Sequence, residues 1–140
     1  MRPLFGGILL MAGCASAPSV EPRVLSHPLP GVLASFRVAL RDHAEVQEEG
    51  NTIVTSWGKP RKTLQEQGYL FENRYEIRVK YRVELEAVAG GTAVRILAGV
   101  ERRPPGGPRS LRWERIASDG SAEKSLFDEV ALGLEPRKDP

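Results

Sequence analysis

Apolar and charged residues alternate most regularly over residues 74–88, which read RYEIRVKYRVELEAV. Every odd position is apolar, from Tyr75 to Ala87, and every even position from Glu76 to Glu86 is charged. Side chains alternate across a strand with a period of two, so the pattern predicts a long antiparallel strand. We expect its apolar face to be covered by helices and its charged face to be at most a secondary contact surface.

Shorter patterns predict the remaining strands. Residues 45–57 form a first strand, with Gly50 and Asn51 as a turn or bulge inside it. The sequence Ala-Gly-Gly at 89–91 signals a tight turn, and the alternation at 92–101 predicts the next strand. Prolines at 104, 105 and 108 exclude a central strand there, and residues 111–116 are a candidate short last strand.

Two segments carry apolar residues at helical spacing. The first is residues 31–43, with Val32, Phe36 and Leu40 on one stripe, and the second is residues 121–134, with Phe127 and Val130 on another. The expected order is helix, three or four antiparallel strands, helix. This order predicts an α+β two-layer sandwich at residues 31–135, in which both helices pack on one face of a meander. Residues 136–140 are expected to be a polar tail.

The N-terminus has the layout of an export signal. One basic residue, a short apolar run and small residues precede Cys14. The run is shorter than the ~20 apolar residues that span a bilayer. An ordinary cleaved signal with an incidental cysteine is one interpretation.

The other interpretation is a resemblance to the lipobox of bacterial lipoproteins. Met11, Ala12 and Gly13 match the three positions before the cut, and Cys14 matches the cysteine that receives the lipid. The resemblance implies that residues 1–13 are a lipoprotein signal peptide. Because Ala15 rather than Asp follows the cysteine, it also implies anchoring in the outer membrane, facing the periplasm. Residues 14–30 are rich in proline and serine and predict a flexible tether that spans on the order of 20 Å.

Composition excludes several classes of function. A net charge of +2 gives no argument for nucleic-acid binding, and one cysteine permits no internal disulfide. Two histidines and one cysteine are too few for a structural zinc site, and no phosphate-binding or cofactor motif is present. We therefore expect no metal and no cofactor.

Candidate catalytic groups are few. His43 beside Asp42 is a conceivable base, but a histidine at the end of a helix is favoured by the helix dipole. The carboxylate pairs Glu48–Glu49 and Glu84–Glu86 are expected to face solvent rather than a cleft. The sequence therefore predicts a protein that is not an enzyme.

Basic residues gather in two connections that a meander places at the same end of the sheet. The first connection carries Lys59, Arg61, Lys62 and Arg74, and the second carries Arg102, Arg103, Arg109 and Arg112, with Trp113 close by. We hypothesise a basic rim that contacts an anionic surface such as lipid head groups, lipopolysaccharide or an acidic patch on a partner. The alternative is two solvated loops.

The pattern of elements over residues 30–134 resembles the C lipoprotein of the outer-membrane β-barrel assembly machinery. The residues that carry this resemblance are Val32-Leu33, Ala39-Leu40, Thr55-Ser56-Trp57, residues 75–83 and Trp113. It implies a helix-grip fold that acts as a non-catalytic scaffold among envelope proteins, with barrel-assembly components as candidate partners.

Two other classes stay open. In a carrier of a small apolar ligand, a large cavity would lie under the second helix. In an envelope hydrolase, His43 or a carboxylate pair would line a pocket.

Overall fold

A long hairpin organises the fold. The computed structural model describes residues 21–62, 75–104 and 111–136. Strands β5 (Glu76–Val88) and β6 (Gly91–Arg103) have 13 residues each and pair along their whole length, from Glu76 opposite Arg103 to Val88 opposite Gly91. Alternation predicts these strands because it is a local property of the sequence, and the tight turn expected at residues 89–91 is confirmed.

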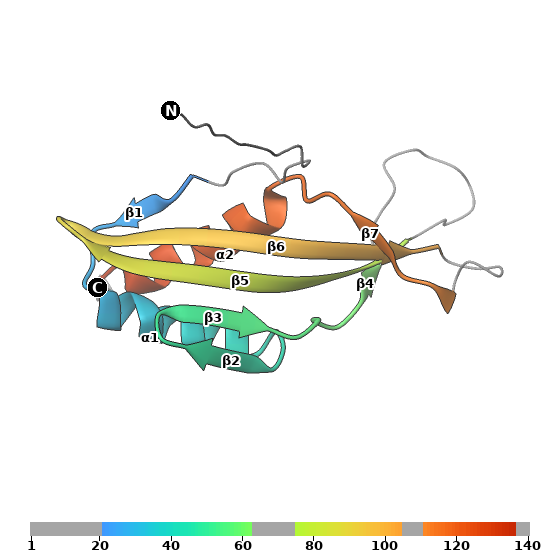
Figure 1. Ribbon diagram of the computed structural model, residues 1–140, viewed down its shortest axis with the longest axis horizontal. Helices are drawn as coiled ribbons and strands as arrows, with labels where there is room; N and C mark the ends of the chain where they lie inside the picture. The colour runs from blue at the N-terminus through green and yellow to red at the C-terminus, as the bar shows by residue number, and fades with distance from the viewer. Residues whose placement is uncertain (1–20, 63–74, 105–110, 137–140) are drawn as a thin grey trace, which may run out of the picture.

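Within the described ranges, shorter strands extend this hairpin into a seven-stranded antiparallel sheet in the order β1-β6-β5-β3-β2, with β4 beside β5 and β7 beside β6 (Figure 1). These strands are β1 (Arg23–Leu25), β2 (Val46–Glu49), β3 (Thr52–Thr55), β4 (Arg61–Lys62) and β7 (Glu114–Ile116). The predicted strand at residues 45–57 is thus a β2–β3 hairpin that turns at Gly50 and Asn51. Gly50 has a φ of 60°, a left-handed conformation that glycine adopts without strain.

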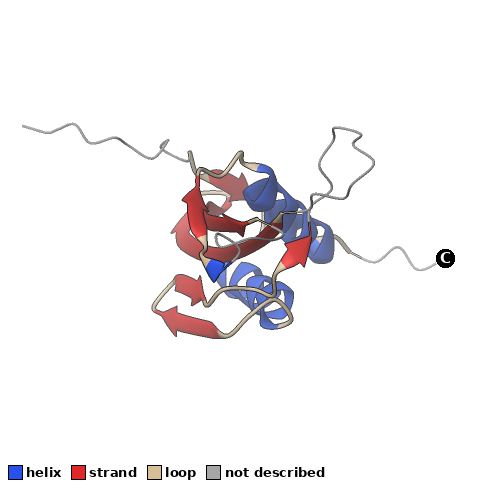
Figure 2. Cartoon of the chain, turned by 90° about the vertical axis from the view of Figure 1, so that its right-hand side faces the viewer, coloured by secondary structure: helices blue, strands red, loops and turns tan. Residues whose placement is uncertain are grey.

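Helices α1 (Leu29–Arg41) and α2 (Ser121–Leu134) pack on one face of the sheet (Figure 2). The α+β class and the antiparallel sheet with two helices are confirmed. Pro30 lies in the first turn of α1, where its missing N–H breaks no helical hydrogen bond. The proline is thus compatible with a helix that begins at Leu29, two residues before the predicted start. The helix ends at Arg41 rather than at His43.

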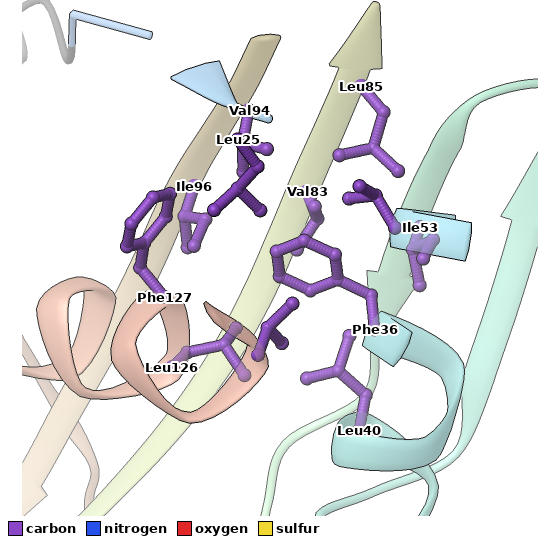
Figure 3. Packing of buried hydrophobic residues seen from close by; sticks show 12 residues of the cluster. Leu25, Phe36, Leu40, Ile53, Val83, Leu85, Val94, Ile96, Leu126 and Phe127 are labelled. Atoms are coloured by element: carbon purple, nitrogen blue, oxygen red, sulfur yellow. The ribbon is translucent and has the colours of Figure 1, made fainter. Parts of the chain in front are cut away.

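One hydrophobic cluster joins the two layers (Figure 3). Phe36 of α1 and Val130 of α2 are at most 1% exposed and pack with Val83 of β5 and Ile96 of β6. The odd positions of β5 and the even positions of β6 therefore face the helices, since Val83 lies opposite Ile96 in the ladder. These side chains belong to the core directly beneath the helices.

The helices cover only part of the hairpin. Along β5 the buried side chains are Val83 and Leu85, whereas residues 75–81 are all half-buried, on both faces. The end of the sheet that carries β4 and β7 extends beyond both helices (Figure 1). The prediction that the whole odd-numbered face packs under helices is therefore wrong for the first half of β5. A helix rises less per residue than a strand, so helices of 13 and 14 residues are shorter than a hairpin whose strands have 13 residues each.

Part of the segment expected to be a tether is structured. Residues 23–25 form β1, paired with residues 92–94 of β6, and Leu25 is 8% exposed. The hydroxyl of Thr92, itself fully buried, donates a hydrogen bond to the His27 carbonyl at 2.7 Å. The prediction of a flexible tether over residues 14–30 is therefore wrong for residues 23–30. The sequence pattern did not reveal β1 because three paired residues are too few to show a period.

Candidate functional site

A stack of cations and aromatic rings lies on the sheet face opposite the helices, at the uncovered end. The Arg78 guanidinium lies 4.5 Å from the Trp57 ring centroid and 4.3 Å from that of Trp113. Lys80 lies 4.8 Å from the Trp57 centroid, and Arg103 lies 4.6 Å from that of Trp113. We call these five residues the cation–aromatic face. Each contact places a cation against the electron-rich face of an aromatic ring.

The ladder register positions the arginines. Arg78 is directly opposite Glu101, and its Nε and Nη2 donate to Glu101 Oε1 at 2.9 and 2.5 Å. Arg103 is opposite Glu76, and its Nε and Nη2 donate to Glu76 Oε2 at 2.9 and 2.6 Å. These charge-assisted bonds fix the guanidinium planes over the tryptophan rings.

Lys80 differs from the two arginines because no ion pair of the described residues includes it. Its charge is available to a partner, whereas the charges of Arg78 and Arg103 are largely committed to glutamates. The five residues therefore combine a preorganised aromatic platform with a cation that forms no ion pair with any carboxylate in the described part of the chain.

The structure brings together the two connections expected to form a basic rim. Arg61 of β4 lies opposite Ile77, next to the pair of Glu76 and Arg103, so both connections reach the same end of the sheet. Lys59, Arg61 and Arg112 are exposed there.

The remaining residues predicted for the basic rim are not shown as exposed cations at that end of the sheet. Arg102 donates to Glu114 at 3.4 Å and lies 5.2 Å from the Tyr75 ring, on the helix side of the sheet. Lys62 contributes its backbone to β4. Arg74 and Arg109 lie outside the described residues, as do Met11, Ala12, Gly13 and Cys14.

His43 is held by backbone rather than by a catalytic partner. Its Nε2 lies 3.0 Å from the Val79 carbonyl, which also accepts the Gly58 N–H at 2.9 Å. Because a carbonyl only accepts, Nε2 carries the proton and donates it. A Cβ at Gly58 would lie 2.5 Å from Nε2, so only glycine fits beside this ring. The Tyr81 ring packs at 5.0 Å from the His43 ring and restricts it further.

The carboxylates weighed as catalytic pairs do not meet in a cleft. Glu48 pairs with Arg37 at 2.6 Å, Glu49 and Glu86 are exposed, and Glu84 is half-buried. Within the described ranges, no group of three or more His, Cys, Asp or Glu side chains is arranged to hold a metal ion.

A cavity of about 740 Å³ opens between β6, β7 and the start of α2. Its apolar lining includes Val94, Ile96, Ala98, Ile116 and Phe127. Charged side chains surround it, namely Glu21, Arg23, Arg115, Asp119, Glu123 and Lys124. It therefore lies beside the N-terminal end of α2 rather than in the core between the helices and the sheet.

Sequence reasoning missed the partners of the cation–aromatic face. Alternation placed Trp57 on the face of Ile53 and Thr55, but β3 ends at Thr55 and Trp57 contacts the opposite side of β5. The available signal was the pair of tryptophans that flank short strands beside a basic ladder at Arg78 and Lys80. Which tryptophan meets which cation depends on the register of strands distant in sequence.

No protein-family model matches this chain, and a search of curated proteins gives no significant match. Among the described residues, no helix has the length and apolar character required to cross a bilayer.

Proposed function

We propose that this chain is a lipid-anchored protein of the outer membrane, facing the periplasm, whose helix-grip domain is a non-catalytic interaction module. The lipobox-like sequence that ends at Cys14 supports the anchor. The observation that carries the proposed interaction is the cation–aromatic face, which lies on the part of the sheet that no described helix covers.

The chemistry of this face favours an anionic surface as its partner. Half-buried tryptophans present an apolar body with a polar edge, which suits the boundary between water and lipid or protein. Lys80 supplies positive charge beside them, and Lys59 and Arg112 are exposed at the same end of the sheet. Basic residues near an anionic membrane contribute about 1 kcal/mol each to binding. A scaffold role in outer-membrane protein assembly is the finer form of this proposal, supported by the resemblance of the element pattern.

Vesicle co-sedimentation tests the interaction. Every described element lies after residue 20, so a chain that starts at residue 15 contains the whole domain. We expect binding to vesicles of phosphatidylglycerol and phosphatidylcholine, and the binding should weaken as salt is raised. The combined change Lys59→Glu, Lys80→Glu and Arg112→Glu should lower the affinity by at least about 100-fold, because the loss of three favourable contributions of about 1 kcal/mol each already amounts to about 3 kcal/mol.

A matched control separates this surface from net charge. Arg37, Arg41 and Lys124 are exposed on the two helices, on the other side of the sheet, and their reversal to glutamate changes the total charge by the same amount. The control triple variant should retain most of the binding. Equal losses in both triple variants would contradict a localised surface. Salt-dependent capture of an acidic envelope protein, with no binding to anionic vesicles, would assign the same face to a protein partner.

The anchor is tested separately by labelling cells with a tagged fatty acid. The label should appear on the protein, and Cys14→Ser should abolish it and release the protein from the membrane fraction. A label that persists in the serine variant would contradict lipidation at this position.

The cavity beside α2 favours a second candidate function, a carrier of a small apolar ligand. Its volume of about 740 Å³ and its lining by Ile96 and Phe127 suit such a ligand. Saturable binding of a fluorescent fatty acid, displaced by unlabelled fatty acid and lost when a bulkier side chain replaces Ala98, would support this candidate.

A further inference from the structure

The outer edge of β6 is paired at two places and open between them. Strand β1 pairs with residues 92–94 and β7 pairs with residues 100–102. Among the described elements, no strand pairs with residues 95–99 along this edge. Both flanking strands run antiparallel to β6, and the chain leaves the sheet before Arg23 and after Ile116. The sheet therefore has an opening in the middle of one edge.

The backbone in this opening points its polar groups outward. The Ala98 N–H donates to Glu123 Oε1 at 3.2 Å, and Glu123 belongs to α2 rather than to the sheet. Backbone groups alternate in direction along an antiparallel strand, so the N–H and C=O of Ile96 and the C=O of Ala98 point the same way. The Ser118 hydroxyl donates to Glu123 Oε2 at 2.8 Å and holds the carboxylate in place. Glu123 Oε1 thus occupies the position where a neighbouring strand would offer a carbonyl.

The two sides of the opening differ in chemistry. On the helix side, Ile96, Ala98, Ile116 and Phe127 line the cavity of about 740 Å³. On the opposite side lie Leu97 and the Arg115 side chain, whose Nη2 is 3.2 Å from the position that a Cβ on Gly99 would take. No ion pair of the described residues includes Arg115.

We propose that this opening binds a short extended peptide that adds a strand antiparallel to β6. The residues opposite Ile96 and Ala98 are apolar and enter the cavity, and the residue opposite Leu97 is acidic and faces Arg115. Three residues span about 10 Å of strand, which fits between the ends of β1 and β7. On binding, the peptide backbone forms hydrogen bonds with the open edge of β6, where the Glu123 carboxylate otherwise accepts the Ala98 N–H.

A peptide fits these observations better than a lipid does. An acyl chain could fill the apolar cavity, but it has no groups to pair with the backbone of Ile96 and Ala98. The inference goes beyond the proposed function and does not rest on it, because the opening shares no residue with the cation–aromatic face.

N-methylated peptides test the strand geometry directly. The probe is a blocked five-residue peptide with a valine–glutamate–valine core, titrated into the chain that starts at residue 15. The two valine amides point toward β6 and the glutamate amide points away. Methylation of the valine amides should weaken binding at least about tenfold, because two hydrogen bonds are lost. Methylation of the glutamate amide should have little effect, and the amide resonances of Ile96 and Ala98 should shift on binding of the parent peptide.

A charge exchange tests the orientation. Arg115→Glu should weaken binding of the glutamate peptide and strengthen binding of a lysine analogue. Arg41→Glu is the matched control, since Arg41 is exposed at the end of α1 and does not line the cavity, and it should leave both affinities unchanged.

Three results would overturn the proposal. Equal effects of methylation at the valine and glutamate amides would show that no strand is added. Binding of fatty acid without binding of peptide would assign the cavity to an apolar ligand. Peptide binding that appears only after residues 15–20 are removed would assign the opening to the chain's own N-terminal segment rather than to a partner.

Discussion

The substitution Gly91→Ala tests whether β1 belongs to the folded domain. Gly91 begins β6 with a φ of +151°, and a Cβ added to it would lie 1.9 Å from the backbone oxygen of Leu25. The nearest obstacle is therefore main chain rather than a flexible side chain, so β1 must move away. Gly90, the preceding residue, has a φ of +86° and nothing within 4 Å of an added Cβ. Gly90→Ala is thus a control that shares the backbone strain without the clash.

The expected cost follows from what β1 contributes. A non-glycine residue in a left-handed conformation costs about 1–2 kcal/mol, and this applies to Gly90→Ala. Displacing β1 also exposes Leu25, which is 8% exposed in the structure, and burial of a leucine side chain is worth about 1.5–3 kcal/mol. It further separates the Arg23 guanidinium from the Phe127 ring, 3.7 Å away. We therefore expect Gly91→Ala to reduce the free energy of unfolding by about 3–5 kcal/mol.

Urea denaturation followed by tryptophan fluorescence measures both variants. Hydrogen exchange at the Val94 amide, which lies opposite Arg23, reports on β1 itself and should accelerate only in Gly91→Ala. Losses of stability that agree within about 0.5 kcal/mol, the usual scatter of surface substitutions, would refute the docking of β1 against the hairpin.

Two further predictions concern the core and its edge. Phe36→Ala should lower the free energy of unfolding by about 3–5 kcal/mol, because Phe36 is fully buried. Val38, also on α1, is 54% exposed, and Val38→Ala should cost under about 0.5 kcal/mol. Equal costs of the two substitutions in urea denaturation would contradict the packing. Burial and the nearby Glu123 carboxylate raise the pKa of Tyr81 above its ordinary value of 10.0. The unfolded chain then ionises first, so stability should fall as pH rises above about 10, and Tyr81→Phe should lessen that fall; an unchanged pH profile would argue against burial of this hydroxyl.

Most regular elements of this protein were predictable because their signals are local. The odd–even alternation of residues 76–88 defines a strand whatever it pairs with, and the glycines at 90 and 91 define the turn that follows. The stripes through Phe36 and Val130 define two helices in the same way. These signals led to the α+β class without knowledge of the register.

The candidate site was only partly predictable. The sequence indicates that basic residues converge at one end of the sheet, since a meander returns there. It does not indicate that Arg103 is bound to Glu76, or that Arg78 lies between two tryptophans. Those contacts join residues from different strands, so they depend on which residue lies opposite which.

The sequence by itself determined the hairpin, the helices and the lipobox-like pattern around Cys14, because the signal for each lies within a short stretch of neighbouring residues. The tertiary structure alone decided the pairing of β1, the length of sheet that the helices leave uncovered, and the opening between β1 and β7. The physical reason is that strands of three residues have no detectable period. Their positions follow from long-range packing, such as that of Leu25 in the core and of the Thr92 hydroxyl against the His27 carbonyl.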